Sequence, residues 1–218
     1  MSTGQIPTDD TPAEAPRHEF QVTESREVFA GRIISVRSDT VTMPGGGTSQ
    51  RDVVEHPGAV GVVALDDSER IVTVRQYRHP VRRRLVELPA GLLDQPDEPA
   101  VEAAKRELVE EVGLEAERWD VLVDGLISPG MANETIRIFL ARDLRAVEQP
   151  EAEHEELDMT VEWLPLTDAV DAILAGGIEN GMAVMGILAA GEARRRGFEG
   201  LRPADAPWPS KPAAGGQG

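Results

Sequence analysis

The segment from residue 88 to residue 114 constrains the fold more than any other part of the chain. It reads LPAGLLDQPDEPAVEAAKRELVEEVGL. Apolar residues recur there at the spacing of one helical face, at Val101, Ala104, Leu108 and Val112. Proline is tolerated in a first helical turn and glycine closes a helix, so Pro99 and Gly113 predict where this helix begins and ends. The segment therefore predicts a loop, one helix over residues 98–112, and a stop.

The predicted helix carries several carboxylates beside its apolar face. Glu107 and Glu111 are four residues apart and Glu110 lies in the same turn, so their charges repel unless a cation lies among them. Arg106 neutralises part of this charge. An isolated pair of glutamates at this spacing is usually a solvated face. Because hard oxygen donors suit Mg²⁺ or Mn²⁺, the denser pattern here favours a divalent cation site.

The residues of this segment resemble the Nudix box, G-x5-E-x7-R-E-U-x-E-E-x-G-U, in which U is apolar. The matching residues are Gly91, Glu98, Arg106, Glu107, Leu108, Glu110, Glu111, Gly113 and Leu114. One departure is an extra residue between Gly91 and Glu98, which leaves the spacing within the helix intact. The chain thus looks like a Nudix hydrolase, and further residues considered below resemble the ADP-ribose pyrophosphatase subgroup.

The resemblance implies an α/β protein with the Nudix fold, a mixed β-sheet sandwiched between helices, with an N-terminal antiparallel β-sheet region. We expect residues 18–57 to form that N-terminal region, which would dimerise, and residues 58–201 to form the Nudix hydrolase domain. Residues 1–17 are rich in proline, threonine and acidic residues, and residues 202–218 are rich in proline, alanine and glycine. We expect both segments to be flexible tails.

The local pattern also predicts individual elements of the main domain. A continuous apolar run at 59–65 predicts a buried strand, and a turn before residues 71–77 predicts that these two strands form a hairpin. The remaining elements are expected as strands at 119–126, 135–140 and 160–164 and as helices at 167–174 and 178–196, the first of these helices capped by Thr167.

Composition excludes several classes of protein. With 218 residues and 40% apolar content the chain suits one domain with a substantial core. The absence of cysteine excludes a disulfide scaffold. A net charge of −17 argues against nucleic acid as a partner. Because no signal segment or membrane-length apolar run is present, we expect a cytoplasmic protein without a membrane partner.

The resemblance also implies a metal site. In the family, about two to three Mg²⁺ (or Mn²⁺) ions activate water for attack on a pyrophosphate. The implied ligands here are the backbone carbonyl of Ala90 and the carboxylates of Glu107 and Glu111, with Glu110 and Arg106 as further catalytic residues.

A general base is expected from the acidic stretch at residues 150–158. This stretch is either a solvated charge run or a mobile loop that brings a carboxylate to the attacking water. In relatives the base comes from the equivalent loop. Glu156 is the first candidate and Glu155 the second.

The candidates for substrate binding lie outside the helix. Arg78 could clamp a phosphate or stack on adenine, or instead pair with nearby acids. Arg51 could reach the substrate of a partner in a homodimer, or be a surface arginine on an edge strand. Glu87 could take a ribose or inner metal position, or be an exposed strand glutamate. Pro129 and Glu134, in the sequence SPGMANE, match a proline and a glutamate of the subgroup.

Together these features predict metal-dependent hydrolysis of ADP-ribose, a small-molecule nucleoside diphosphate, to AMP and ribose 5-phosphate by water attack at phosphorus. Another sugar nucleotide or dinucleotide is an alternative, because the box specifies the diphosphate and not its ends. A non-catalytic Nudix ligand sensor is a second alternative, which the retained Glu107, Glu110 and Glu111 disfavour. A simple cation-binding protein would leave Gly91 and Arg106 unexplained.

Overall fold

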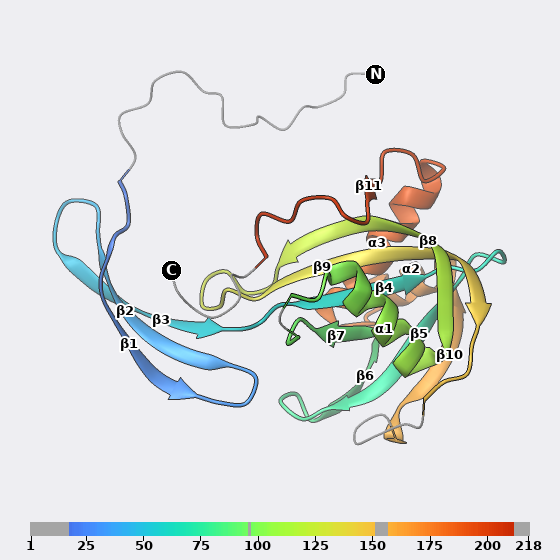
Figure 1. Ribbon diagram of the computed structural model, residues 1–218, viewed down its shortest axis with the longest axis horizontal. Coiled ribbons are helices and arrows are strands. Elements are labelled where there is room, and N and C mark those ends of the chain that lie inside the picture. Colours follow the sequence, from blue (N-terminus) through green and yellow to red (C-terminus); the bar gives the residue numbers. More distant parts are fainter. Residues whose placement is uncertain (1–17, 96, 151–156, 212–218) are drawn as a thin grey trace.

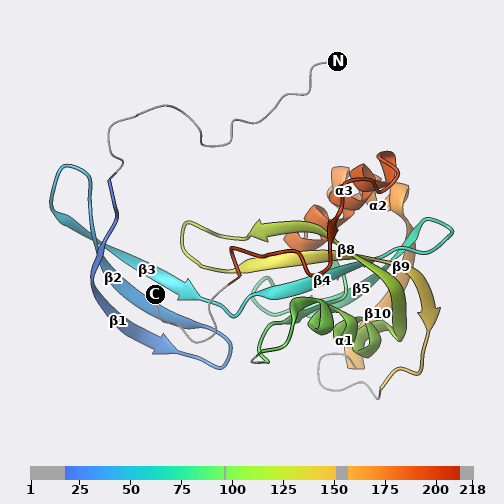
Figure 2. The ribbon, with the colours of Figure 1, turned by 45° about the horizontal axis from the view of Figure 1, so that its top comes forward.

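The N-terminal sheet projects from the rest of the molecule. The computed structural model describes residues 18–95, 97–150 and 157–211. The first three strands form an antiparallel sheet in the order β1 (Val22–Ala30), β2 (Ser35–Thr42) and β3 (Thr48–Glu55). Figures 1 and 2 both show this sheet extending away from the main body. β1 is exposed along its whole length, although it carries Val22, Val28 and Phe29.

The main body contains two further sheets. A mixed five-stranded sheet has the order β11-β8-β9-β4-β7, in which β4 and β9 are parallel and the other neighbours are antiparallel. Its strands are β4 (Ala59–Ala64), β7 (Ala90–Leu92), β8 (Leu114–Leu126), β9 (Thr135–Ala146) and β11 (Arg202–Pro203). An antiparallel sheet has the order β10-β5-β6, formed by β10 (Thr160–Pro165), β5 (Arg70–Arg78) and β6 (Arg83–Glu87).

The predicted hairpin of β4 and β5 is wrong. Only one bridge, Leu65 to Ile71, joins the two strands. Beyond it β4 pairs with β7 and β9, whereas β5 pairs with β6 and β10. β4 is buried at every residue because it is an inner strand covered on both faces. A hydrophobic run alone does not reveal which neighbours such a strand will have.

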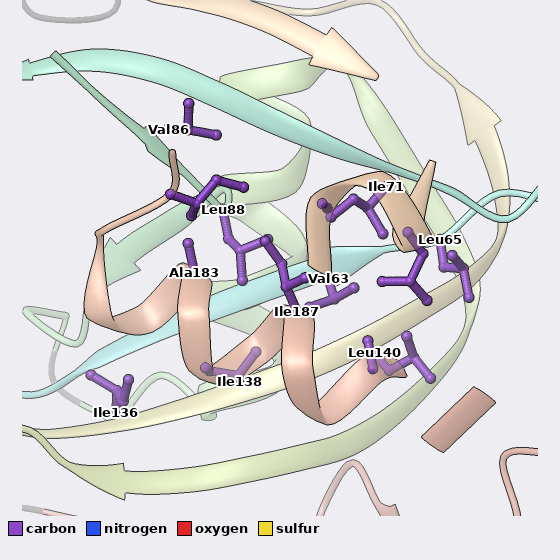
Figure 3. Packing of buried hydrophobic residues seen from close by; sticks show 14 of the residues in the cluster. Val63, Leu65, Ile71, Val86, Leu88, Ile136, Ile138, Leu140, Ala183 and Ile187 are labelled. Carbon is purple, nitrogen blue, oxygen red and sulfur yellow. The ribbon is translucent and has the colours of Figure 1, made fainter. Parts of the chain in front are cut away.

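Helices cover both faces of the mixed sheet. α1 (Ala100–Val112) packs on one face, where Ala103, Ala104 and Leu108 join the core. α2 (Leu166–Leu174) and α3 (Gly181–Arg195) belong to the core cluster of the other face. Figure 3 shows Ala183 and Ile187 of α3 within that cluster. The mixed sheet between helices and the separate N-terminal sheet confirm the predicted fold class.

The ends of the last two helices differ from the prediction. Thr167 does not cap α2, because the helix begins one residue earlier and its N-terminal cap position is Pro165. α3 begins at Gly181 and not at Ile178, because the Asn180 side chain accepts a hydrogen bond from the Ala183 amide and caps it there.

The chain remains packed beyond residue 201. β11 pairs with β8, and Ala204 and Ala206 pack against the core cluster on the α1 side. The expectation of a tail is therefore wrong for residues 202–211, whose small and proline-rich sequence lies along the sheet. No helix within the described ranges is long and apolar enough to span a membrane.

Candidate active site

α1 is fixed in the core and ends where the sequence predicts. Leu108 is completely buried, and the αL conformation of Gly113, at φ 63°, closes the helix with its amide donating to the Val109 carbonyl at 3.0 Å. Because one face of the helix is packed, the glutamates beside that face have a defined direction.

Glu107 lies directly against Gly91 of β7. A Cβ atom added at Gly91 would overlap the Glu107 carboxylate, so only glycine permits this approach. Burial raises the pKa of Glu107 above its ordinary value, and Glu110 and Asp94 add to this, although Arg106 opposes it. A partly buried carboxylate whose charge is disfavoured in this way is a favourable position for a cation.

Glu111 connects the same helix to the residue before Gly91. Its carboxylate accepts a hydrogen bond from the Ala90 amide at 3.0 Å, and the residue is only 8% exposed. Glu107 and Glu111 are therefore one helical turn apart and both lie against β7. This is the arrangement expected from the box.

Arg106 forms ion pairs with three carboxylates of the box. It binds Glu107 at 2.6 Å, Glu110 at 2.9 Å and Glu98 at 3.3 Å. Burial opposes the charge on the guanidinium, but these three partners outweigh it and raise the pKa of Arg106 above its ordinary value. Arg106 thus holds the acidic helix together. The loop before Glu98, which holds the extra residue, turns through Asp97 at φ 66°, and Arg106 binds the glutamate that follows.

The donor set suits a hard divalent cation. The buried carboxylate of Glu111 and the partly buried carboxylate of Glu107 lie beside the Ala90–Gly91 backbone, and the missing Cβ at Gly91 leaves room for Glu107. Oxygen donors of this kind suit Mg²⁺ or Mn²⁺. Within the described ranges no three His, Cys, Asp or Glu side chains form a ready metal cluster. Ala90, Glu107 and Glu111 are therefore the residues that could hold such an ion.

Arg78 and Glu87, both candidates for substrate binding, bind each other. The Arg78 guanidinium donates to the Glu87 carboxylate at 2.7 and 2.9 Å, and Gln76 donates to it at 3.3 Å. Glu87 is 2% exposed, so the alternative of an exposed strand glutamate is wrong. Sequence reasoning missed Gln76, although its alternation with Val72 and Val74 indicates an inward-facing position.

The loop between β8 and β9 carries Pro129 and Glu134. Pro129 is exposed, and the backbone carbonyl of Glu134 closes the loop by accepting a hydrogen bond from the Ile127 backbone amide at 3.1 Å. Two backbone hydrogen bonds attach the loop to β3. The Val54 amide donates to the Met131 carbonyl at 2.8 Å, and the backbone amide of Asn133 donates to the Val54 carbonyl at 3.1 Å. It therefore joins the N-terminal sheet to the main body.

Arg51 lies apart from the box, on the exposed surface of β3. Its guanidinium donates to Ser49 at 2.6 Å and to the Gln50 carbonyl at 2.9 Å. Within the described part of one chain, therefore, the structure does not bring Arg51 to Glu107 or Glu111.

The two candidates for the general base, Glu155 and Glu156, lie outside the described residues. Just beyond them, Asp158 is bound by Arg84 of β6 at 2.5 Å, a link that sequence reasoning missed. Before them, Pro150 borders a cavity of about 690 Å³ on the outer side of α1, which Arg106 and Glu110 also line. The box helix thus faces open space on this side.

Comparison with known proteins identifies the family of the chain. Residues 55–183 match the NUDIX domain, and residues 20–54 match the nucleoside diphosphate sugar hydrolase N-terminal domain. The chain belongs to the Nudix family. The first match covers most of the main body and includes the whole box, and the second covers the projecting sheet.

Relatives of this Nudix hydrolase include the following named proteins. It is 49% identical to ADP-ribose pyrophosphatase of Mycobacterium tuberculosis, over 90% of this chain and 95% of that protein. It is 36% identical to methanol dehydrogenase activator of Bacillus methanolicus, over 78% and 91% of the two chains. A crystal structure of an ADP compounds hydrolase has the same fold, with a TM-score of 0.72 at 21% identity, and covers 84% of this chain and 99% of that one.

Proposed function

We propose that this Nudix hydrolase cleaves ADP-ribose to AMP and ribose 5-phosphate by water attack at phosphorus. The observation that carries the proposal is the placement of Glu107 and Glu111 against Gly91 and Ala90. The name of the mycobacterial relative, which matches nearly the full length of both chains, supports ADP-ribose as the substrate.

Ala90, Glu107 and Glu111 would hold the metal ions, Mg²⁺ or Mn²⁺ and about two to three in number. When bound, such ions neutralise the pyrophosphate and lower the pKa of a bound water. The role of α1 is to present both carboxylates from a fixed backbone. Arg106 keeps Glu110 and Glu98 in place beside them, at 2.9 and 3.3 Å.

The proton of the attacking water would go to Glu156, with Glu155 as the second candidate. The base needs to reach the attacking water only while substrate is bound, so it can come from a loop that moves when the site closes. The Arg84–Asp158 ion pair supports this assignment, because it ties the chain immediately after these residues to β6. β6 leads directly into the Ala90–Gly91 segment.

Arg78, Glu87, Pro129, Glu134 and Arg51 would bind the substrate. The Arg78 side chain is 41% exposed while it is bound to Glu87, so the pair can fix the guanidinium and still present it to a phosphate or adenine.

The N-terminal region, residues 18–57, would form a homodimer, and residues 58–201 would be the catalytic domain. The exposed apolar residues of β1 support this division, because monomeric proteins seldom leave such a strand uncovered. In the dimer Arg51 would reach the partner's substrate. We place the enzyme in the cytoplasm.

Another nucleoside diphosphate-linked compound is the second candidate, since a relative that is 30% identical over 62% of this chain is named GDP-mannose pyrophosphatase. Purified protein would be incubated with ADP-ribose, nucleotide sugars and dinucleotides, with and without Mg²⁺ or Mn²⁺, and the products followed by chromatography. The proposal expects metal-dependent release of AMP, fastest from ADP-ribose. Faster cleavage of another compound would replace the substrate, and binding without cleavage would favour a sensor.

A further inference from the structure

The segment at residues 202–211, which follows α3 at the end of the chain, lies along β8 and β9. Arg202 and Pro203 pair with Val121 and Asp120 of β8. In Figures 1 and 2 the segment then runs beside the mixed sheet toward the loop between β8 and β9. Neither the box nor the substrate candidates described above use this segment.

A buried arginine fastens the segment to the sheet. The side chain of Arg137 on β9 is 3% exposed, and it binds Asp124 on β8 at 2.7 Å. Its remaining donors bind the carbonyls of Ala206, at 2.7 Å, and Pro207, at 3.0 Å. A buried guanidinium is costly unless its donors are satisfied, so these two carbonyls are needed for Arg137 to stay where it is.

Trp208 covers the same guanidinium. The centre of the Arg137 guanidinium lies 4.8 Å from the centroid of the Trp208 ring, within the range of a cation–π contact. The indole Nε1 is buried and has no hydrogen-bond partner within the described structure. Its ring is therefore held by stacking on Arg137 and not by a hydrogen bond of its own.

The fastened segment reaches the residue next to Glu134. Ser210 contacts the Thr135 hydroxyl at 3.4 Å, and that hydroxyl also contacts the Gly125 carbonyl at 3.2 Å. Thr135 is completely buried and begins β9, directly after the loop. The loop is thus held on one side by β3 and at its base by residues 202–211.

We propose that residues 202–211 are a clamp that positions the loop between β8 and β9 for substrate binding, with Trp208 as its positioning residue. The clamp keeps the ends of β8 and β9 paired at Leu126 and Thr135, and so fixes the point from which Glu134 projects. The part of this inference that concerns substrate rests on the proposed function, whereas the part that concerns the loop does not.

The test compares Trp208→Ala with Trp208→Phe, which keeps a ring over Arg137, and with Glu199→Ala as a control at an exposed residue outside the clamp. Amide hydrogen exchange of the metal-free protein is measured first. Trp208→Ala should speed exchange about tenfold for the amides of residues 127–135 and leave the amides of α2 unchanged, while Phe restores protection. Ser210→Ala, which cannot disturb the stacking, should give a smaller change in the same peptides.

Kinetics then test the link to substrate. With ADP-ribose, or whichever nucleoside diphosphate the wild type cleaves, Trp208→Ala should raise KM about fivefold and change kcat less than about twofold. Unchanged exchange in residues 127–135, or equal acceleration throughout the molecule, would overturn the clamp. Local acceleration with an unchanged KM would overturn its role in substrate binding. A wild type that cleaves no diphosphate would refute the proposed function alone, because the exchange result stands without it.

Discussion

The Glu111 carboxylate accepts a hydrogen bond from the backbone amide of Ala90 at 3.0 Å. This bond joins the last turn of α1 to the start of β7. The helix is itself anchored through Leu108, so a carboxylate from the helix and the backbone of the strand are held at one place. The precision of the site therefore depends on the packing of α1 through Leu108 and on the absence of a side chain at Gly91.

Gly91→Ala should reduce activity without unfolding the protein. The added methyl group would overlap the Glu107 carboxylate and displace it, which we expect to lower kcat/KM about 100-fold. The matched control is Gly181→Ala, because nothing lies within 4 Å of a Cβ at that residue. Steady-state kinetics and thermal unfolding of both variants check this, and equal activity of the two would contradict the close approach.

Arg78→Ala should destabilise the protein through Glu87. The change leaves a carboxylate that is 2% exposed without its guanidinium, at a cost of about 2 kcal/mol in the free energy of unfolding. Adding Glu87→Gln should recover about half of that loss, because the buried charge is removed. Urea unfolding measures all three proteins. Arg83→Ala, which breaks an exposed ion pair with Glu179, should cost less than about 0.5 kcal/mol.

The Asp124–Arg137 pair should make stability depend on pH. Burial alone would raise the pKa of Asp124, but hydrogen bonds from Arg137 and Arg202 outweigh it and hold that pKa below its ordinary value. A carboxyl whose pKa is lower in the folded state stabilises the fold when it is ionised. This contribution is therefore complete above about pH 5 and is lost as pH falls through the unfolded pKa of about 3.9 and below.

Asp124→Asn should accordingly cost about 3 kcal/mol in the free energy of unfolding at pH 7, and less at pH 3, where part of the contribution of the ionised carboxylate is already lost. Asp143→Asn is the control, because Asp143 is half exposed and lies 3.8 Å from Arg118, and it should change stability by less than about 0.5 kcal/mol at either pH. Denaturant unfolding at the two pH values measures both. A constant cost for Asp124→Asn would show that its ionisation does not contribute.

Glu156→Gln should lower kcat and spare substrate binding, since a base acts on the water and not on the nucleotide. We expect a decrease of about 10²- to 10⁴-fold in kcat with KM within a factor of about three. Glu155→Gln is its matched neighbour. If only Glu155→Gln lowers kcat, the base is Glu155. If neither substitution lowers kcat, the assignment of the base to residues 150–158 is wrong.

The sequence predicted the box well because its geometry is local. The body of the helix, its end at Gly113 and the position of Glu107 beside the packed face follow from spacings within one turn or two. The predicted start was wrong by two residues, because the helix begins at Ala100 and Pro99 takes the N-terminal cap position. The buried state of Glu87 was not predictable in this way, since it depends on Arg78 and Gln76 of the neighbouring strand. Alternation within β5 contained a signal for Gln76, but none for the partner of Arg78.

The strands that pair with β4 and the path of residues 202–211 could also not be predicted from the sequence. A continuous apolar run is equally compatible with a hairpin and with an inner strand between β7 and β9. Residues 202–211 have the composition of a flexible tail, yet the buried Arg137 donates hydrogen bonds to two of their backbone carbonyls. Contacts between residues far apart in the chain decide such cases.

The most direct test of the central claim is the effect of Mg²⁺ on wild type, Glu107→Gln and Glu111→Gln, measured as release of AMP from ADP-ribose together with the shift in Tm. The wild type should gain activity and thermal stability on adding Mg²⁺. Each variant should lose more than about 100-fold in kcat and most of the Mg²⁺-dependent rise in Tm. Its Tm without metal should stay at or above that of the wild type, because the substitution removes a charge that burial disfavours. Full metal-dependent activity in either variant would contradict the assignment of these two carboxylates as the metal site.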